Sequence, residues 1–390
     1  MVPDSVAFWG TGALIAVFLF AASAPSPLYG TYAALWHFSA STLTVVFALY
    51  AFALLLGLLV TGRLSDHLGR RPVILGGIAV EIAGMVLFIL ANSTEVLGIA
   101  RAVQGFATGA VIGVLSAALV ELSGAVGPGL APMVSSAAPT FGLATGALGS
   151  SALVQYGPAP LRLVYWLIFA ALVLGFGFVL LVRETGERRP GALASLKPVA
   201  NIHRDARPAF VQVSPSLVAL WALIGFYLSL APGLIASIEQ SRNLLWGGAA
   251  IFCLCMAGSL AVVLLKGVSA WTAMFYGCAA LFVGVGVTAV AIAVTDGPLF
   301  IIATVVAGVG FGLAFLGAFR AVGAVTPADE RAGTLASLYI VSYLAFSVPI
   351  VLAGIAQTHY PAHTVALVFS GAVAVLAGIG AVTALPNLNR

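Results

Sequence analysis

The sequence predicts an all-helical membrane protein whose chain crosses the bilayer many times. Of its 390 residues, 62% are hydrophobic and only 7% are charged, which is more apolar surface than a water-soluble core can bury. The apolar residues form continuous runs of about 20 residues, the length that a helix needs to span a bilayer. A membrane β-barrel would show short segments of alternating polarity instead. Because lipid offers the backbone no hydrogen-bond partners, these runs are expected to be helices.

The apolar runs assign twelve spans along the chain. They cover residues 7–29, 42–61, 73–91, 96–120, 133–155, 161–182, 214–236, 245–265, 271–294, 298–319, 333–356 and 363–385. Short loops join most of them, but residues 183–213 are charged, contain prolines and are not apolar. We therefore expect an N-terminal six-helix bundle (1–182), a cytoplasmic central loop (183–213) and a C-terminal six-helix bundle (214–390).

The basic residues are distributed unevenly between the two sides of the predicted protein. If both termini are cytoplasmic, thirteen of the sixteen Lys and Arg residues fall on the cytoplasmic side. Only Arg162 and Arg242 fall outside, and Arg101 lies within a span. Such an excess of basic residues sets the orientation of membrane proteins. It also accounts for the formal net charge of +4, so that no nucleic-acid partner is expected.

The two halves of the sequence resemble a diverged repeat at an offset near 203 residues. At this offset, Gly105 and Gly109 of the fourth span correspond to Gly308 and Gly312 of the tenth. Matching glycines and equal numbers of spans indicate an internal duplication. Two halves of the same orientation favour a substrate site at their interface.

A charged turn lies between the second and third spans, where residues 62–75 read GRLSDHLGRRPVIL. This turn resembles the signature loop of the major facilitator superfamily, usually G-x-L-A-D-R/K-x-G-R-R/K-x-x-x-L. The matching residues are Gly62, Leu64, Asp66, Gly69, Arg70, Arg71 and Leu75, whereas Ser65 and His67 depart from the pattern. With the twelve spans and the long central loop, the resemblance covers the whole chain. It implies the fold of this superfamily, twelve transmembrane helices in two pseudo-symmetric six-helix bundles.

The resemblance implies that the signature loop acts as a conformational latch. Asp66 is expected to face the N-terminus of the eleventh span, because the partial positive charge of a helix start favours a carboxylate. Arg70 would pair with Glu121 at the cytoplasmic end of the fourth span. The expected latch comprises Gly62, Asp66, Gly69, Arg70, Arg71 and Glu121, and it would stabilise the outward-facing state. The alternative is that these charges only enforce topology.

Two charged residues lie well inside predicted spans, Glu81 in the third and Arg101 in the fourth. Arg101 lies about 9 Å from the outer end of its span, where a charge is costly unless it is paired or hydrated. A lone carboxylic acid in apolar surroundings is suited to carry a proton. We expect Glu81 and Arg101 to serve proton coupling or to bind substrate charge. Two alternatives stay open: the residues form a static ion pair, or Arg101 reaches the outer headgroups.

The expected substrate cavity follows from the superfamily, in which the first, fourth, seventh and tenth spans line it. Its expected lining, extended to the eleventh span, is Ser26, Tyr29, Gln104, Tyr227, Phe311, Phe315, Tyr339 and Tyr343. An aromatic and weakly polar lining suits an amphipathic organic molecule. Each aromatic residue could equally serve helix packing. Pro25 and Pro27 are expected to break the first span near its outer end.

The fifth span resembles the antiporter motif of the superfamily, G-x-x-x-G-P-x-x-G-G, only loosely. Residues 142–151 read GLATGALGSS, so that Ala147 replaces the proline and Ser150-Ser151 replace the last two glycines. This departure leaves the direction of transport open. The small residues are still expected to allow close packing with the opposite half.

These features predict a secondary transporter that works by alternating access and most resembles proton-coupled exporters of drugs and metabolites. No glycine-rich phosphate loop with a lysine is present, so we expect a proton gradient as the energy source and no cofactor. No nucleophile–base set and no metal-ligand spacing is present, so neither an enzyme nor a metal site is expected. The alternatives are a uniporter or importer of a small metabolite, and a transport-inactive sensor or scaffold.

The arginine content indicates where the protein resides. Fourteen arginines against two lysines, with many Ala and Gly residues, are typical of a GC-rich bacterial genome. We therefore expect a multi-pass protein of the bacterial inner (plasma) membrane, with both termini in the cytoplasm. Its expected partners are the lipid bilayer and a small-molecule substrate, and the superfamily implies a monomer.

Overall fold

The computed structural model describes residues 1–127, 129–186, 189–198, 200–327 and 330–388. The count of basic residues above includes Arg188 and Arg390, which lie outside these ranges. Every regular element within the ranges is helical. Among the described residues, 12 helical segments are long and apolar enough to cross a membrane, in agreement with the predicted fold class.

The chain divides into two compact units. Unit 1 comprises Met1–Leu28 and Leu49–Pro198, and unit 2 comprises Tyr29–Ala48 and Val199–Arg390. The first part of the predicted central loop therefore groups with unit 1. The segment Tyr29–Ala48, which includes α2 and the first part of α3, groups with unit 2 although it lies early in the chain.

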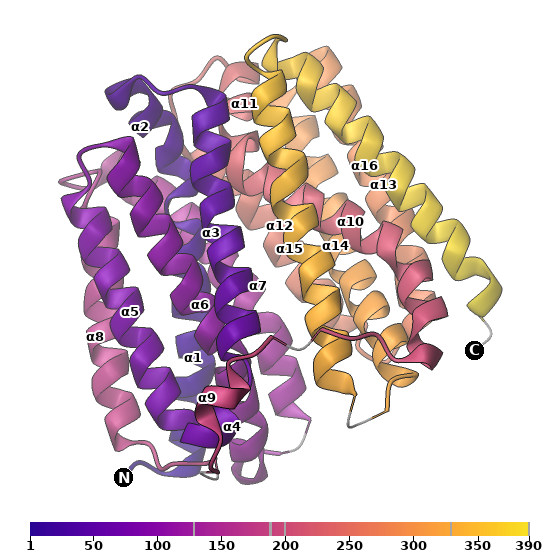
Figure 1. Cartoon of the computed structure of the whole chain (residues 1–390). Helices are drawn as coiled ribbons and strands as arrows, with labels where there is room; N and C mark the ends of the chain where they lie inside the picture. The colour runs from indigo at the N-terminus through magenta and orange to yellow at the C-terminus, as the bar shows by residue number, and fades with distance from the viewer. Residues whose placement is uncertain (128, 187–188, 199, 328–329, 389–390) are drawn as a thin grey trace. The chain divides into compact units, whose positions relative to one another are not determined.

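Unit 1 is a bundle of long helices with short helical pieces at its ends. Its elements are α1 (Asp4–Ser23), η1 (Ser26–Leu28), α3 (Ala40–Thr61) from residue 49 onward, α4 (Ser65–Leu68), α5 (Arg70–Leu90), α6 (Thr94–Leu122), η2 (Ser123–Ala125), α7 (Leu130–Tyr156), α8 (Leu163–Leu181) and α9 (Ala192–Ser195). In this unit α1 packs against α6 and α7, and α5 packs between α6 and α8. Figure 1 shows the short helices α4 and α9 together at the end of unit 1 where the chain begins.

Unit 2 has the same kind of architecture. Its elements are α2 (Tyr29–Trp36), the first part of α3, η3 (Arg204–Ala206), α10 (Arg207–Ser229), α11 (Ala231–Ile238), α12 (Leu245–Leu264), α13 (Ala270–Val294), α14 (Gly297–Ala324), α15 (Arg331–Ala356), α16 (Ala362–Ala384) and η4 (Leu385–Asn387). Here α13 packs against α14 and α16, and α10 packs against α15 and α16. Helix α10 begins at Arg207, within the predicted loop, because Pro208 suits the first turn of a helix.

The first span of each half is broken at an equivalent place. Helix α1 ends at Ser23 and is followed by α2, and α10 ends at Ser229 and is followed by α11. Pro25 removes a backbone N–H and ends the first helix, as the sequence predicted. Pro232 lies in the first turn of α11. Each break divides a membrane span into a long and a short helix.

The predicted correspondence of the glycines appears as equivalent packing in the two units. Gly105 and Gly109 of α6 lie against the backbone of α3, where a Cβ atom on Gly109 would meet the carbonyl oxygen of Leu54. Gly308 and Gly312 of α14 lie against the backbone of α12 in the same way. Glycine allows these helix pairs to approach closely.

Candidate functional site

A cluster of hydrogen bonds holds the signature loop at one end of unit 1. The Arg70 side chain donates through Nη1 to Asp66 Oδ1 at 2.6 Å and to Ser65 Oγ at 2.5 Å. Its Nε donates to Glu121 Oε1 at 3.1 Å. The predicted Arg70–Glu121 pair is thus present, and Arg70 joins the loop to the end of α6. The Asp66 side chain is 53% exposed, so it remains accessible beyond this pair.

Glu184 is a further member of this cluster that the sequence did not reveal. Its Oε1 accepts hydrogen bonds from the backbone N–H groups of Arg70 at 2.7 Å and of Gly186 at 3.0 Å. Its Oε2 accepts from the backbone N–H of Arg71 at 3.2 Å. Glu184 therefore caps the start of α5, which has free N–H groups and a partial positive charge. One feature of the sequence could have indicated this role: Glu184 comes soon after the sixth span, on the same predicted side of the membrane as the signature loop.

The glycines of the predicted latch have distinct structural roles. Gly69 has a φ of 93°, a conformation that favours glycine, and a Cβ there would meet the carboxylate of Glu184. Gly62 donates its backbone N–H to Leu58 O at 3.0 Å and follows the end of α3. Arg71 donates through Nη2 to the carbonyl oxygen of Leu180 at the end of α8. Hydrogen bonds thus connect the loop to α3, which precedes it, and to the end of α8.

The segment after α8 also holds the middle of the signature loop. The backbone N–H of Arg189 donates to the carbonyl oxygen of His67 at 3.0 Å. The Nδ1 atom of His67 lies 2.9 Å from the carbonyl oxygen of Pro190. Because a carbonyl oxygen only accepts, Nδ1 of His67 carries a proton. His67 therefore serves a local contact at the position where the superfamily usually has a basic residue.

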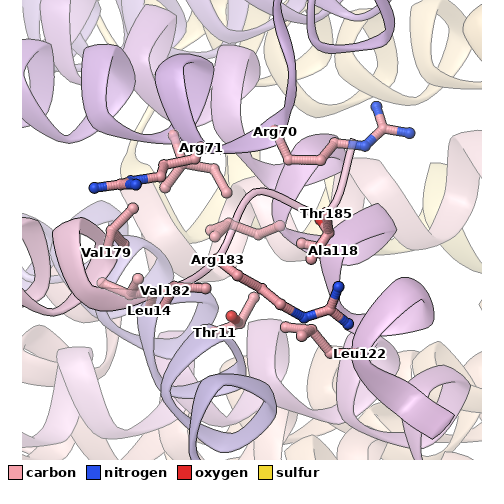
Figure 2. Close-up of a pocket in the computed structure, with 12 residues that line it drawn as sticks. Thr11, Leu14, Arg70, Arg71, Ala118, Leu122, Val179, Val182, Arg183 and Thr185 are labelled. Carbon is pink, nitrogen blue, oxygen red and sulfur yellow. The ribbon is translucent and has the colours of Figure 1, made fainter. Parts of the chain in front are cut away.

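A small pocket lies under this cluster, among α1, α5, α6 and the end of α8 (Figure 2). Apolar side chains such as Leu14 and Val182 line it, and Figure 2 shows the guanidinium group of Arg71 on one side of the pocket and those of Arg70 and Arg183 on the other. Arg183 donates through Nε and Nη2 to the carboxylate of Asp4, at 2.7 and 2.9 Å. These bonds raise the pKa of Arg183 above its ordinary value. Because its arginines are engaged outward, we assign this pocket no ligand.

A second cluster is buried within unit 1, where the break in α1 frees backbone carbonyl groups. Pro25 has no N–H for the carbonyl oxygen of Ala21, which accepts instead from Gln104 Nε2 at 2.9 Å. The carbonyl oxygen of Ala22 accepts from Arg101 Nη1 at 3.0 Å, and the same nitrogen donates to Gln104 Oε1 at 2.6 Å. Arg101 is therefore hydrogen-bonded to the broken helix.

Arg101 has an aromatic neighbour as well as these acceptors. Its guanidinium carbon lies 4.2 Å from the centroid of the Tyr50 ring, within the range of a cation–π interaction. The Arg101 side chain is only 1% exposed in the structure. The charge of Arg101 is thus stabilised within the unit by the Ala22 carbonyl oxygen, the Gln104 amide oxygen and the face of Tyr50.

Glu81 lies beside this cluster on α5 and is fully buried. Gln104 and the charge of Arg101 both interact electrostatically with Glu81. Neither carboxylate oxygen of Glu81 accepts a hydrogen bond from a described residue. The amide nitrogen of Gln104 also donates to the carbonyl oxygen of Ala21 in α1. The structure thus brings together Glu81 and Arg101, which were predicted to serve proton coupling or to bind substrate charge, and Gln104, which was predicted to line the cavity.

An aromatic cluster lies within unit 2 and contains three of the predicted lining residues. The ring of Trp221 on α10 has its centroid 6.3 Å from that of Phe315 and 5.2 Å from that of Tyr343. Phe319 links Phe315 to Tyr339, with centroid distances of 4.4 and 5.5 Å. All five rings are half-buried. They offer π faces and two phenol groups to a ligand, whereas the indole nitrogen of Trp221 is buried.

The other predicted lining residues lie apart from this cluster. Tyr227 is fully buried, and its hydroxyl group lies 2.7 Å from that of Thr304 inside unit 2. Phe311 is buried against Gly258 of α12. Ser26 and Tyr29 are buried on either side of the boundary between η1 and α2. The structure therefore divides the predicted lining between packing positions and the half-buried aromatic cluster.

The small residues of the fifth span pack within unit 1. A Cβ on Gly142 would meet the carbonyl oxygen of Ala16, and a Cβ on Gly146 would meet the side chain of Ser23. Both neighbours lie on α1, which packs along α7. Gly142 and Gly146 thus pack against α1 inside unit 1, and close packing of the fifth span with the opposite half stays a prediction.

The family model of the Major Facilitator Superfamily matches residues 11–348. The chain therefore belongs to this superfamily, and the described residues are those of a multi-pass membrane protein. The predicted superfamily and its fold are confirmed.

Curated relatives match short segments of the chain. An uncharacterized transporter of Rickettsia bellii is 43% identical over 75 residues, 19% of this chain and 19% of that protein. The inner membrane transport protein YajR of Escherichia coli is 31% identical over 118 residues, 30% of this chain and 26% of that protein. The chain thus matches about a fifth to a quarter of these relatives' length.

Solved structures resemble the chain over almost its whole length. The xylose transporter XylE of Escherichia coli, in an inward open conformation, has a TM-score of 0.77 and 13% identity, covering 98% of this chain and 95% of that one. A mutant of the nucleoside transporter NupG has a TM-score of 0.75 and 13% identity, covering 96% and 99%. At this identity the similarity concerns the fold alone.

Proposed function

We propose that this transporter exports a small amphipathic organic compound in exchange for protons, by alternating access. It works without a cofactor, as a monomer in the bacterial inner membrane, with both termini in the cytoplasm. The single observation that carries the proposal is the buried acid Glu81, whose carboxylate oxygens accept no hydrogen bond from a described residue.

The surroundings of Glu81 support a proton-carrying role. A buried carboxylate without hydrogen bonds is costly, whereas the neutral acid is tolerated. Arg101 and Gln104 act in the opposite direction, because they interact favourably with the ionised form. Glu81 is therefore placed where a modest change in its surroundings alters proton binding. Coupling requires such a group, because substrate movement must change its proton affinity.

The aromatic cluster of unit 2 supports the class of substrate. Trp221, Phe315, Phe319, Tyr339 and Tyr343 provide flat apolar surfaces with a few polar atoms. Such surfaces bind amphipathic organic molecules and accept lipophilic cations over the ring faces. A multiply charged substrate would lack a partner on these residues.

The cluster around the signature loop supports the latch. Arg70 connects Asp66, Ser65 and Glu121 through its Nε and Nη1 atoms. Topology alone needs basic charge on the loop but none of these specific hydrogen bonds. We therefore assign the predicted latch residues a role in the conformational cycle.

An importer or uniporter of a small metabolite is the second candidate. Ala147 stands where the antiporter motif has proline, so the fifth span lacks the motif that marks exporters. A relative in fold, XylE, is named a xylose transporter. Uptake and export can be separated by vesicles of opposite orientation.

The test uses purified protein in liposomes that contain a pH-sensitive dye. Tetraphenylphosphonium serves as a lipophilic cation and chloramphenicol as a neutral amphiphile. We expect one of them to trigger proton movement with the wild type and not with Glu81→Gln. Glu95→Gln, which removes an exposed acid of α6, is the matched control and should behave as wild type.

Two outcomes would contradict the proposal. Compound flux without proton movement, unchanged in Glu81→Gln, would favour the uniporter and leave Glu81 as a structural residue. Proton movement that persists in Glu81→Gln would show that another group carries the proton.

A further inference from the structure

Besides the carbonyl groups of Ala21 and Ala22, a third carbonyl group at the break of α1 accepts a side-chain hydrogen bond, and its donor is Ser150. The Ser150 hydroxyl donates to the carbonyl oxygen of Ala24 at 2.6 Å, and both residues are fully buried. In a continuous helix this oxygen would accept from the backbone N–H of Leu28. That N–H donates instead to the carbonyl oxygen of Pro25 at 3.0 Å. Ser150 of α7 therefore replaces the backbone bond that the break removes.

The carbonyl oxygen that Ser150 binds belongs to the same stretch of backbone at the end of α1 as the carbonyl oxygens that Arg101 and Gln104 bind. Glu81, Arg101 and Gln104 are called the Glu81 cluster below. Gln104 donates to Ala21, and Arg101 donates to Ala22, just before Ala24 in the chain. Movement of the break would displace these acceptors and with them the two side chains. Gln104 and Arg101 are also the groups that interact with Glu81. A chain of contacts thus leads from Ser150 through α1 to the buried acid.

We infer that Ser150 is a positioning residue for proton coupling. It fixes the end of α1, so that Arg101 and Gln104 keep their places beside Glu81. This inference rests on the proposed function, because the Glu81 cluster has a functional role only if transport is coupled to protons. Ser150 touches none of the reacting groups itself, and it acts through the backbone of α1.

The neighbouring Ser151 provides a matched control. It has the same side chain and is also fully buried. Its hydroxyl donates to the carbonyl oxygen of Ala147 in its own helix, at 2.9 Å. Ser151→Ala therefore removes a buried hydroxyl group without releasing a carbonyl of α1.

The first experiment measures transport of tetraphenylphosphonium and chloramphenicol in proteoliposomes. We expect Ser150→Ala to lower the maximal rate by roughly five- to tenfold, the effect of one lost buried hydrogen bond. KM should stay unchanged, because Ser150 is assigned no substrate contact. Ser150→Thr, which keeps the hydroxyl, should restore the rate, and Ser151→Ala should match the wild type. A rate of Ser150→Ala equal to that of Ser151→Ala would overturn the inference.

The second experiment needs no substrate. Replacing Pro25 and Pro27 by alanine restores the N–H donors, so that α1 can continue and Leu28 can bond Ala24. Ser150→Ala should lower the unfolding temperature in the native sequence but not in this proline-free background. An equal loss in both backgrounds would show that Ser150 is independent of the break.

The two experiments separate this inference from the proposed function. If the wild type moves neither compound, the transport proposal fails for these probes, and the unfolding temperatures still decide whether Ser150 compensates the break. If the wild type transports and Ser150→Ala transports equally well, only the positioning role fails. Ser150→Cys, a weaker donor of similar shape, replaces Ser150→Ala should the latter not accumulate.

Discussion

The carboxylate of Glu184 accepts a hydrogen bond of 2.7 Å from the backbone N–H of Arg70. Arg70 in turn binds Glu121 at the end of α6 through its side chain. The signature loop is therefore held from two directions, by the end of a span and by the chain that leaves α8. Loss of either contact should loosen the same loop, although the two acids contact different atoms of Arg70.

We predict that Glu184→Ala destabilises the protein by about 0.5–2 kcal/mol, the usual contribution of a residue that caps a helix start. The reason is that the first N–H groups of α5 lose their acceptor. Thermal unfolding of the purified protein in detergent measures the effect. Thr185→Val, a change at the next residue, serves as the control and should unfold near the wild-type temperature. Equal unfolding temperatures for all three proteins would contradict the capping role.

We predict that Asp66→Asn lowers the transport rate by about two- to fivefold while the protein still inserts normally. The reason is the expected attraction between the Asp66 carboxylate and the N-terminus of the eleventh span, since a carboxylate at a helix start contributes about 0.3–1 kcal/mol. Arg70 keeps Ser65 and Glu121 as partners in this variant, so the loop stays folded. Transport at equal membrane abundance is the measurement.

Arg63→Gln distinguishes the latch from a purely topological role of Asp66 and its neighbours. Arg63 is an exposed basic residue of the same loop. Its loss reduces the basic charge of the loop without removing the ion pair of Asp66. Normal transport by Asp66→Asn, or an equal reduction by Arg63→Gln, would argue against the latch.

We predict opposite effects for alanine at two glycines of α6. Gly109→Ala should destabilise the protein by about 1–3 kcal/mol, the usual cost of overpacking, because its Cβ would meet the Leu54 carbonyl of α3. Gly113→Ala should stabilise it by up to about 1 kcal/mol, because alanine favours helix and the site is open. Thermal unfolding in detergent measures both. A stable Gly109→Ala protein would show that α3 and α6 can separate without cost.

Much of the architecture could be predicted because hydrophobicity and helix length are properties of the local sequence. The twelve spans and the break at Pro25 follow from apolar runs and from the missing N–H of proline. The pairing of Arg70 with Glu121 required more, namely the resemblance of residues 62–75 to a known loop. The start of α10 at Arg207 was missed because Arg207, Gln212 and two prolines interrupt the apolar residues of its first turns, so that no continuous apolar run marks them.

The partners of buried polar groups could not be predicted, because they depend on how distant helices meet. The sequence marked Arg101 as a buried charge but did not reveal its bonds to Ala22 and Gln104. It assigned Tyr227 to a cavity, whereas a buried threonine hydroxyl lies next to it. Glu184 resembles the other loop acids until the fold brings it to the start of α5.

The broken first span has a consequence for the history of the chain. Both halves have the break, but Pro25 and Pro27 stand at one, and Pro232 stands at the other, at a different register of the repeat. If the halves descend from one duplicated gene, the interrupted helix is older than the prolines that now accompany it. Selection then preserved the shape of the segment while the residues that enforce it were exchanged. Homologous sequences without prolines at these positions should therefore still have an interrupted first span.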